Sequence, residues 1–256
     1  CKKDNNIYTN GVYTALQLSN TEKESCDGSV QNNGWFDGEC GSLQDCPRLP
    51  ACNNEGTPPF PDLASLDSNT AAAVSYLWQE CVLSGKNDGR FHEEQIITRA
   101  EGLKIPMHLF GHMTGCQANE PFSDVRSSHW FYNIVRCGLT YGVINGNSTR
   151  FRPNSTLSFG EGAKILVVAA VQRGLIELQN PAEGHFSRIG SNNWAYQYVE
   201  TLHHYGAVEA DFLTASPNRG LKRGEFAKMA AGLSPCFCQN VSCDDGCQCD
   251  QASFAC

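Results

Sequence analysis

Fourteen cysteines are the residues of this 256-residue chain whose number and spacing point most directly to chemistry. An even, high count is typical of proteins that fold in an oxidising compartment, where thiols pair as disulfides. The competing chemistry is zinc binding, but no CxxC pair recurs at the spacing of a zinc ribbon or finger. The sequence therefore predicts no metal site and predicts disulfides at Cys1, Cys26, Cys40, Cys46, Cys52, Cys81, Cys116, Cys137, Cys236, Cys238, Cys243, Cys247, Cys249 and Cys256.

Three N-glycosylation acceptor sequences also indicate secretion. They begin at Asn147, Asn154 and Asn240, in segments rich in turn-forming residues, and they predict covalent N-glycans. No apolar run approaches the roughly 20 residues that a membrane-spanning helix needs. The chain begins at Cys1 rather than at a methionine, which we interpret as removal of a signal peptide or as a start within a longer precursor. An extracellular, cell-surface location is expected.

Signatures of catalysis and cofactor binding are missing from the sequence. It contains no HExxH, no GxSxG, no Walker loop and no GxGxxG before a helix, so neither an enzyme nor a cofactor is expected. His203 and His204 are adjacent, and on a helix they would point about 100° apart, which makes a shared metal ion difficult. The net charge of −8, without any basic run, argues against nucleic acid as a partner.

The elements that position these residues fall into parts of different composition. Residues 1–59 form a cysteine-rich segment, in which 7–18 favours a short strand or hairpin. Residues 60–233 carry amphipathic helical patterns, for example around Ile165. Residues 234–256 hold six cysteines and are expected to form a small cap like an EGF or knottin module.

An internal repeat divides the helical part into three units, predicted at 60–118, 119–178 and 179–233. The units begin with similar segments at Phe60, Phe122 and Phe186, which are 62 and 64 residues apart. Each continues with a helix containing an aromatic residue, a turn, a loop and a second helix. One such unit cannot bury its own apolar face, so three are expected to pack together.

Local capping signals mark where these helices begin and end. Thr98 and Ser158 are each followed three residues later by glutamate, which is the spacing of a capping box. Glu101, Glu161 and the corresponding Glu225 are therefore predicted to be caps rather than catalytic acids. Gly142 and Gly206 suit the left-handed position that ends a helix.

The ordered motifs of the repeat resemble the S-layer homology family. The second repeat carries the family pattern at Phe122-Ser-Asp-Val, His129-Trp, Gly142-Val-Ile-Asn-Gly and Phe151-Arg-Pro, and the first carries Ile97-Thr-Arg-Ala-Glu. The resemblance covers roughly two thirds of the chain. It implies a mainly α fold in which three helix–loop–helix repeats form a pseudo-threefold bundle, flanked here by small disulfide-rich terminal segments.

The resemblance also implies a ligand. Proteins of this family attach to cell-wall polysaccharide, often bearing pyruvate ketals, in grooves between repeats, where arginine binds a carboxylate and an indole faces a sugar ring. The glycan contacts carried over to this chain are Arg99, Trp130, Gly146, Trp194 and Arg223. Phe159 stands where the second repeat should have arginine, so at most two grooves keep one. By position alone, the two tryptophans are expected in the core, and the arginines pair equally well with acidic neighbours.

Two functions therefore remain open from the sequence. The first is a subunit of a cell-surface layer or filament, a homopolymer anchored or assembled through the repeats. The second is a monomeric, lectin-like module that binds an acidic, pyruvylated cell-wall polysaccharide.

Overall fold

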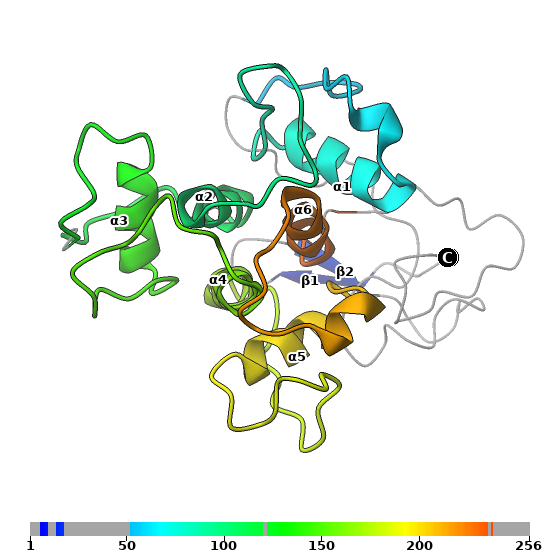
Figure 1. Cartoon of the computed structure of the whole chain (residues 1–256), viewed down its shortest axis with the longest axis vertical. Coiled ribbons are helices and arrows are strands. Elements are labelled where there is room, and N and C mark those ends of the chain that lie inside the picture. The colour runs from blue at the N-terminus through cyan, green and yellow to red at the C-terminus, as the bar shows by residue number, and fades with distance from the viewer. Residues whose placement is uncertain (1–5, 10–13, 18–51, 120–121, 235–236, 238–256) are drawn as a thin grey trace, which may run out of the picture.

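The computed structural model describes residues 6–9, 14–17, 52–119, 122–234 and 237 (Figure 1). These residues are mainly helical, which confirms the expected class. The helices are α1 (Ser68–Gln79), α2 (Arg99–Leu109), α3 (Tyr132–Thr140), α4 (Phe159–Gln172), α5 (Tyr196–His204) and α6 (Arg223–Gly232), with short 3-10 helices η2 (Leu63–Ser65) and η3 (Ala210–Thr214). Strands β1 (Asn6–Thr9) and β2 (Thr14–Gln17) pair antiparallel within the segment where the sequence favours a hairpin.

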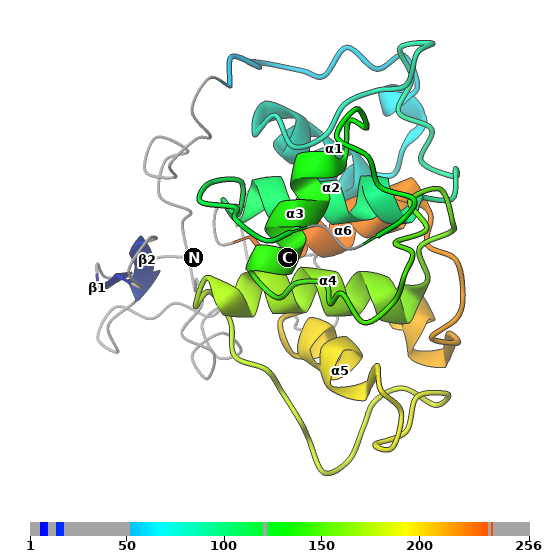
Figure 2. The ribbon, with the colours of Figure 1, turned by 90° about the vertical axis from the view of Figure 1, so that its left-hand side faces the viewer.

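Helices α2, α4 and α6 lie at the centre of the helical part, and α1, α3 and α5 lie outside them (Figures 1 and 2). The closest helix pairs are α1 with α6, α2 with α3, and α4 with α5. Helices α3 and α5 thus each pack against the central helix of the preceding predicted unit, and α1 of the first unit packs against α6 of the third. The helix pairs cross the predicted unit boundaries, because the apolar face of each outer helix is buried by a neighbour rather than within its own unit.

A closed cycle of backbone hydrogen bonds joins the segments that lead into the central helices. The amide of Ile97 donates to the carbonyl of Leu221 (2.9 Å), that of Leu221 to Leu157 (3.0 Å), and that of Leu157 to Ile97 (3.0 Å). All three side chains are buried. Isolated β-bridges flank the cycle at Ile96 with Lys222, Thr98 with Thr156, and Ser158 with Gly220.

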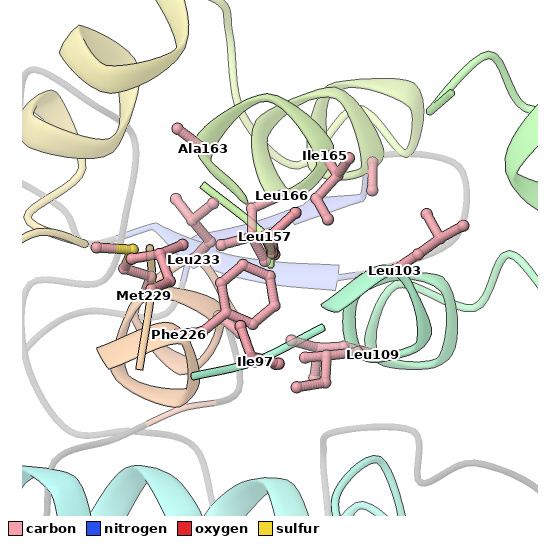
Figure 3. Close-up of a cluster of buried hydrophobic side chains, with 14 of the residues drawn as sticks. Ile97, Leu103, Leu109, Leu157, Ala163, Ile165, Leu166, Phe226, Met229 and Leu233 are labelled. Atoms are coloured by element: carbon pink, nitrogen blue, oxygen red, sulfur yellow. The ribbon is translucent and has the colours of Figure 1, made fainter. Parts of the chain in front are cut away.

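The core fills the space between the central helices (Figure 3). Two helical glycines let the helices approach the leucines of the cycle closely. A Cβ added at Gly102 would lie 2.4 Å from Cδ2 of Leu157, and one at Gly162 would lie 2.4 Å from Cδ1 of Leu221. Both positions therefore exclude any larger residue unless the core shifts.

The predicted caps are confirmed. Thr98 with Glu101 and Ser158 with Glu161 form complete capping boxes at the starts of α2 and α4. At α6, the carboxylate of Glu225 accepts a hydrogen bond from the backbone amide of Lys222 (2.8 Å). The predicted turn glycines also behave as expected, since Gly142 and Gly206 have φ of 67° and 63°.

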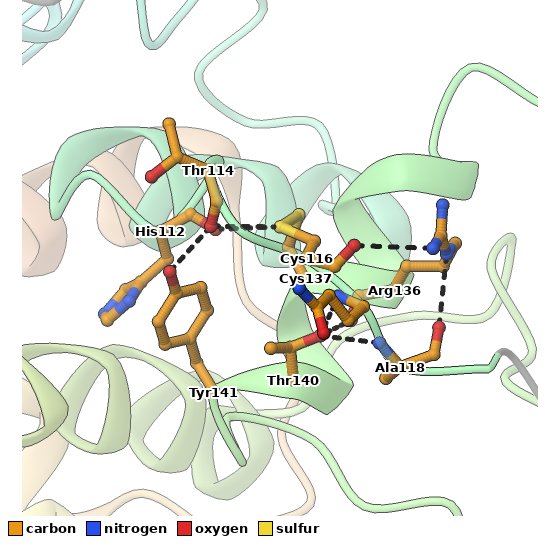
Figure 4. The surroundings of a disulfide bond; sticks show 9 residues. His112, Thr114, Cys116, Ala118, Arg136, Cys137, Thr140 and Tyr141 are labelled. Carbon is orange, nitrogen blue, oxygen red and sulfur yellow. Dashed lines mark hydrogen bonds between the residues drawn. A yellow bond between two sulfur atoms is a disulfide. The ribbon is translucent and has the colours of Figure 1, made fainter.

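Two disulfides lie within the described residues. Cys52 bonds to Cys81 after α1, and Cys116 bonds to Cys137 in α3 (Figure 4). These four cysteines are confirmed as disulfide partners, and the other ten lie outside the described residues. Because Cys52 pairs with Cys81, the end of the predicted N-terminal segment is tied covalently to the helical part, across the boundary predicted at residue 59.

Polar contacts fix the chain around the second disulfide (Figure 4). The Arg136 guanidinium donates to the carbonyls of Cys116 (3.3 Å) and Ala118 (3.2 Å). The Tyr141 hydroxyl donates to the carbonyl of Thr114 (2.6 Å). The segment after α2 is thereby held against α3.

Among the helices of the described ranges, none has the length and apolar character that crossing a bilayer requires.

Candidate functional site

A groove of about 220 Å³ lies where the start of α6 meets α2 and the loop 82–91. Two residues that the resemblance singled out, Arg223 and Trp130, both line it. They come from the third and second predicted repeats, while most of the remaining wall comes from the first. The groove is therefore assembled from all three predicted repeats.

Arg223 is held rigidly on one wall of the groove. Its Nε donates to the carbonyl of Phe91 (2.9 Å) and its Nη2 to that of Ser84 (3.2 Å). The guanidinium carbon lies 4.9 Å from the centroid of the Phe91 ring. Only 7% of the residue is exposed, and this burial lowers the pKa of the Arg223 guanidinium. A fixed, planar cation of this kind is suited to bind a carboxylate with two parallel hydrogen bonds.

The groove carries more positive than negative charge. Lys86, Lys104 and Arg223 line it together with one carboxylate, Glu101. Burial, and then the charge of Arg223, lower the pKa of Lys104. Burial opposes ionisation of Glu101, but hydrogen bonds from Lys86 and Thr98 outweigh it and keep the pKa of that carboxyl below its ordinary value. An acidic ligand would therefore meet an excess of cations in a chain whose net charge is −8.

Both tryptophans of the predicted site are exposed, so the expectation that they pack in the core is wrong. Trp130 is 59% exposed and Trp194 is 52% exposed. The reason is local: the next residue, Phe131 or Ala195, takes the inward position and is buried. An indole that keeps an open apolar face beside a cationic groove can stack on a sugar ring.

A second arrangement brings together Arg99 and Trp194 at the start of α4. Arg99 donates from Nε to the carbonyl of Phe151 (2.9 Å), stacks over the Phe151 ring at 5.3 Å, and forms an ion pair with Glu161. A Cβ added at Gly160 would lie 3.1 Å from the Trp194 ring, so this indole covers the same helix start. Arg223 likewise lies near a capping glutamate, with its Nη1 3.7 Å from Oε1 of Glu101. Both arginines thus combine a carbonyl, a phenyl ring and a capping glutamate, and pairing with acidic neighbours does occur. Gly146 lies exposed in the loop between α3 and α4, outside the lining of the described groove.

At the third equivalent position, residue 159 is phenylalanine rather than arginine, but a guanidinium from elsewhere in the chain is present. Phe159 is buried against the rings of Phe212 (4.9 Å) and Phe186 (5.9 Å). Arg219 instead stacks over Phe212 at 4.6 Å and pairs with the capping Glu225. Arg219 was not among the predicted site residues, because it lies far along the chain from position 159. The signal available was an arginine six residues before the capping glutamate.

Two aspartates fix the loops whose carbonyls and phenyl rings contact the guanidinium groups of Arg223 and Arg99. Asp62 accepts hydrogen bonds from the amides of Phe91 (2.9 Å) and His92 (2.8 Å). Asp124 does the same for Phe151 and Arg152, both at 2.9 Å. Burial opposes ionisation of these aspartates, but the amide hydrogen bonds prevail, and the pKa of each carboxyl is lowered. The aspartate of the family pattern is therefore a positioning residue for the phenyl ring and carbonyl that hold each arginine.

Two of the three predicted glycosylation sites can be placed. Asn147 and Asn154 are exposed in the loop between α3 and α4, and Asn240 lies outside the described residues. Their exposure is compatible with glycans at both positions.

Comparisons with known proteins agree with the resemblance to the S-layer homology family. The sequence model of the S-layer homology domain family matches residues 121–161. The chain is 29% identical over 171 residues to the "Surface-layer 125 kDa protein" of Lysinibacillus sphaericus, covering 65% of this chain and 14% of that protein. It is 26% identical over 179 residues to the "Cell surface protein" of Thermoanaerobacter kivui, covering 67% and 20%. It also matches the "Amylopullulanase" of Thermoanaerobacterium thermosulfurigenes, at 25% identity over 162 residues, covering 62% and 9%. The chain thus spans a fifth or less of these relatives.

These matches, together with the disulfides, indicate an extracellular cell-surface protein. More particularly, residues 121–161 match the S-layer homology domain.

Proposed function

We propose that this chain is the anchoring part of a non-enzymatic cell-surface layer protein, and that it binds an acidic, pyruvylated cell-wall polysaccharide. The observation that carries the proposal is the groove in which the buried Arg223 and the exposed Trp130 meet. A pyruvate ketal presents a carboxylate to the guanidinium and to the lysines, while the indole covers a sugar ring. Arg99 and Trp194 offer a second site of the same composition.

The proposed arrangement behind these sites is a pseudo-threefold bundle of three S-layer homology repeats, at 60–118, 119–178 and 179–233. The closed hydrogen-bond cycle of Ile97, Leu157 and Leu221 supports it. So does the repeated stacking of a guanidinium on Phe91, Phe151 and Phe212. In this arrangement each site lies between neighbouring repeats, so glycan binding depends on the complete bundle.

The comparisons favour an anchor over a catalyst. Proteins named as a surface-layer protein, a cell surface protein and an amylopullulanase each match about two thirds of this chain, over a fifth or less of their own length. A region shared by proteins of such different kinds is not tied to one reaction. Such a region is better suited to anchoring, the role proposed here, than to one catalytic activity.

The experiment is a titration of the native chain with purified wall polysaccharide, before and after removal of its pyruvate by mild acid. We expect saturable binding that depends on pyruvate. Trp130→Ala should weaken binding by roughly fivefold or more, since the loss of an aromatic ring stacked on a flat ligand, as measured for nucleobases, costs about 1–3 kcal/mol. Leu178→Ala is the control, because this exposed side chain does not line the groove. Equal binding by the Trp130 variant, or binding indifferent to pyruvate, would reject the groove as the site.

A second candidate function is self-assembly into a layer or filament. It is favoured by the similarity to the "Surface-layer 125 kDa protein". Electron microscopy of native, non-reduced chain in negative stain tests it directly. Regular sheets or fibres would support a homopolymer, and dispersed particles at high concentration would oppose it.

A further inference from the structure

Three side chains that the proposed glycan site does not use converge beside α5. They are His185, Glu200 and His203, and one ligand atom of each lies within 4.8 Å of the others. His185 comes from the loop before the helix, and the other two come from the helix itself. Glu200 and His203 are three residues apart, so they share one face of α5. No sequence motif joins His185 to them, because it lies 15 residues before Glu200.

Glu200 is a built-in, preoriented ligand. Its side chain is only 1% exposed. Its Oε1 accepts a hydrogen bond from the backbone amide of His185 (2.8 Å), and its Oε2 lies 2.8 Å from Nδ1 of the same residue. A Cβ added at Gly184 would lie 2.8 Å from Oε1, so the loop needs glycine there to approach the carboxylate. One oxygen is thus anchored, and the other is turned toward the imidazoles.

The two imidazoles stack face to face beside this carboxylate. Their ring centroids are 3.9 Å apart and the planes are inclined by 27°. Imidazole binds a metal ion through an unprotonated ring nitrogen, and each of these two rings offers one nitrogen to the cluster.

We propose that His185, Glu200 and His203 bind one divalent transition-metal ion, of which Zn²⁺ is the type. Two nitrogens and one carboxylate oxygen suit zinc, whereas calcium prefers oxygen ligands alone. Zinc–ligand distances are about 2.0–2.2 Å, so two ligands of one ion lie less than about 4.4 Å apart. The ligand atoms lie within 4.8 Å of one another, so they need to approach only slightly, and the His185 side chain, which is 52% exposed, has room to move. The metal replaces the hydrogen bond between Glu200 and His185 and fastens the loop before α5 to the helix.

The test is a zinc titration of the native, non-reduced chain without a histidine tag, in competition with a chromophoric chelator. We expect one zinc ion per chain and no comparable binding of Ca²⁺. His185→Gln and His203→Gln should each weaken zinc binding by more than about tenfold, because loss of groups that merely support a ligand already costs 10–100-fold. His204→Gln is the matched control: it is the next residue on α5 but not part of the cluster, and it should bind like the unchanged chain.

The cysteines require one further measurement, since a free thiolate also binds zinc. Cobalt bound in place of zinc should show no thiolate-to-metal charge-transfer band. A strong band of that kind, no zinc binding, or equal affinity in the folded His185→Gln and His203→Gln variants would each overturn the proposal. Circular dichroism confirms that the variants are folded. The result does not depend on the glycan site, because none of the three side chains lines that groove.

Discussion

The guanidinium of Arg223 lies 4.9 Å from the centroid of the Phe91 ring, although 132 residues separate the two in the chain. This contact joins the start of α6 to the loop of the first predicted repeat. It links two distant ends of the helical part and also supplies the cation of the groove. The same residue therefore contributes to stability and to the proposed glycan site.

Replacing Arg223 with lysine should separate these contributions. Lysine keeps the charge but cannot donate to the carbonyls of Phe91 and Ser84 in the same geometry or stack on the ring. We expect a loss of about 1–3 kcal/mol in the free energy of unfolding, measured in urea without reductant. Glycan binding should fall further than stability predicts, since the bidentate contact is lost. Arg126→Lys, at an exposed position, should change neither quantity.

The close approach at Gly102 makes alanine there destabilising. The added Cβ would meet Leu157, which is 1% exposed and surrounded by core. We expect Gly102→Ala to lower the free energy of unfolding by about 1–3 kcal/mol, despite the better helix propensity of alanine. Gly190→Ala is the control, since its Cβ would make only an ordinary contact, at 3.5 Å. Equal stability of the two variants would contradict the packing argument.

Stability should fall as the solution is acidified below about pH 6.5, the ordinary pKa of histidine. His112 is fully buried, and its Nε2 lies 2.8 Å from the carbonyl oxygen of Ala169, which leaves Nδ1 without a hydrogen-bond partner among the described residues. Burial lowers the pKa of His112 in the folded chain. Below about pH 6.5 the unfolded chain therefore binds a proton at this histidine that the folded chain does not bind. Unfolding is favoured as the pH falls through this range.

Urea denaturation between pH 7.5 and 5 checks this expectation. One such histidine contributes a slope of at most about 1.4 kcal/mol per pH unit. His112→Asn should be less stable at pH 7.5 but should show a shallower slope. An unchanged slope would assign the effect to other groups, such as His203, whose pKa is lowered in the same direction.

The disulfide between Cys116 and Cys137 should be a major source of stability. It closes a loop with a sequence separation of 21. Replacing both cysteines with serine should lower the free energy of unfolding by roughly 3 kcal/mol, since the unfolded chain regains the freedom of that loop. The paired replacement avoids a free thiol. A loss well below 1 kcal/mol would indicate that the hydrogen bonds of Arg136 hold the segment without the disulfide.

The sequence by itself determined the features that depend on near neighbours. The capping boxes at Thr98 and Ser158 were predictable because their partners lie three residues away. The turns at Gly142 and Gly206 were predictable because only glycine adopts a positive φ readily. The repeat motifs, with the cysteines and glycosylation sequences, were enough to predict a mainly α, extracellular protein that resembles the S-layer homology family.

The tertiary structure alone decided which distant residues meet. It paired each outer helix with a central helix of another predicted unit, turned Trp130 and Trp194 outward, and placed Arg219 where residue 159 lacks its arginine. It also brought His185 beside His203. These outcomes depend on segments tens of residues apart that bury one another's side chains. Such contacts cannot be predicted from the spacing of residues along the chain.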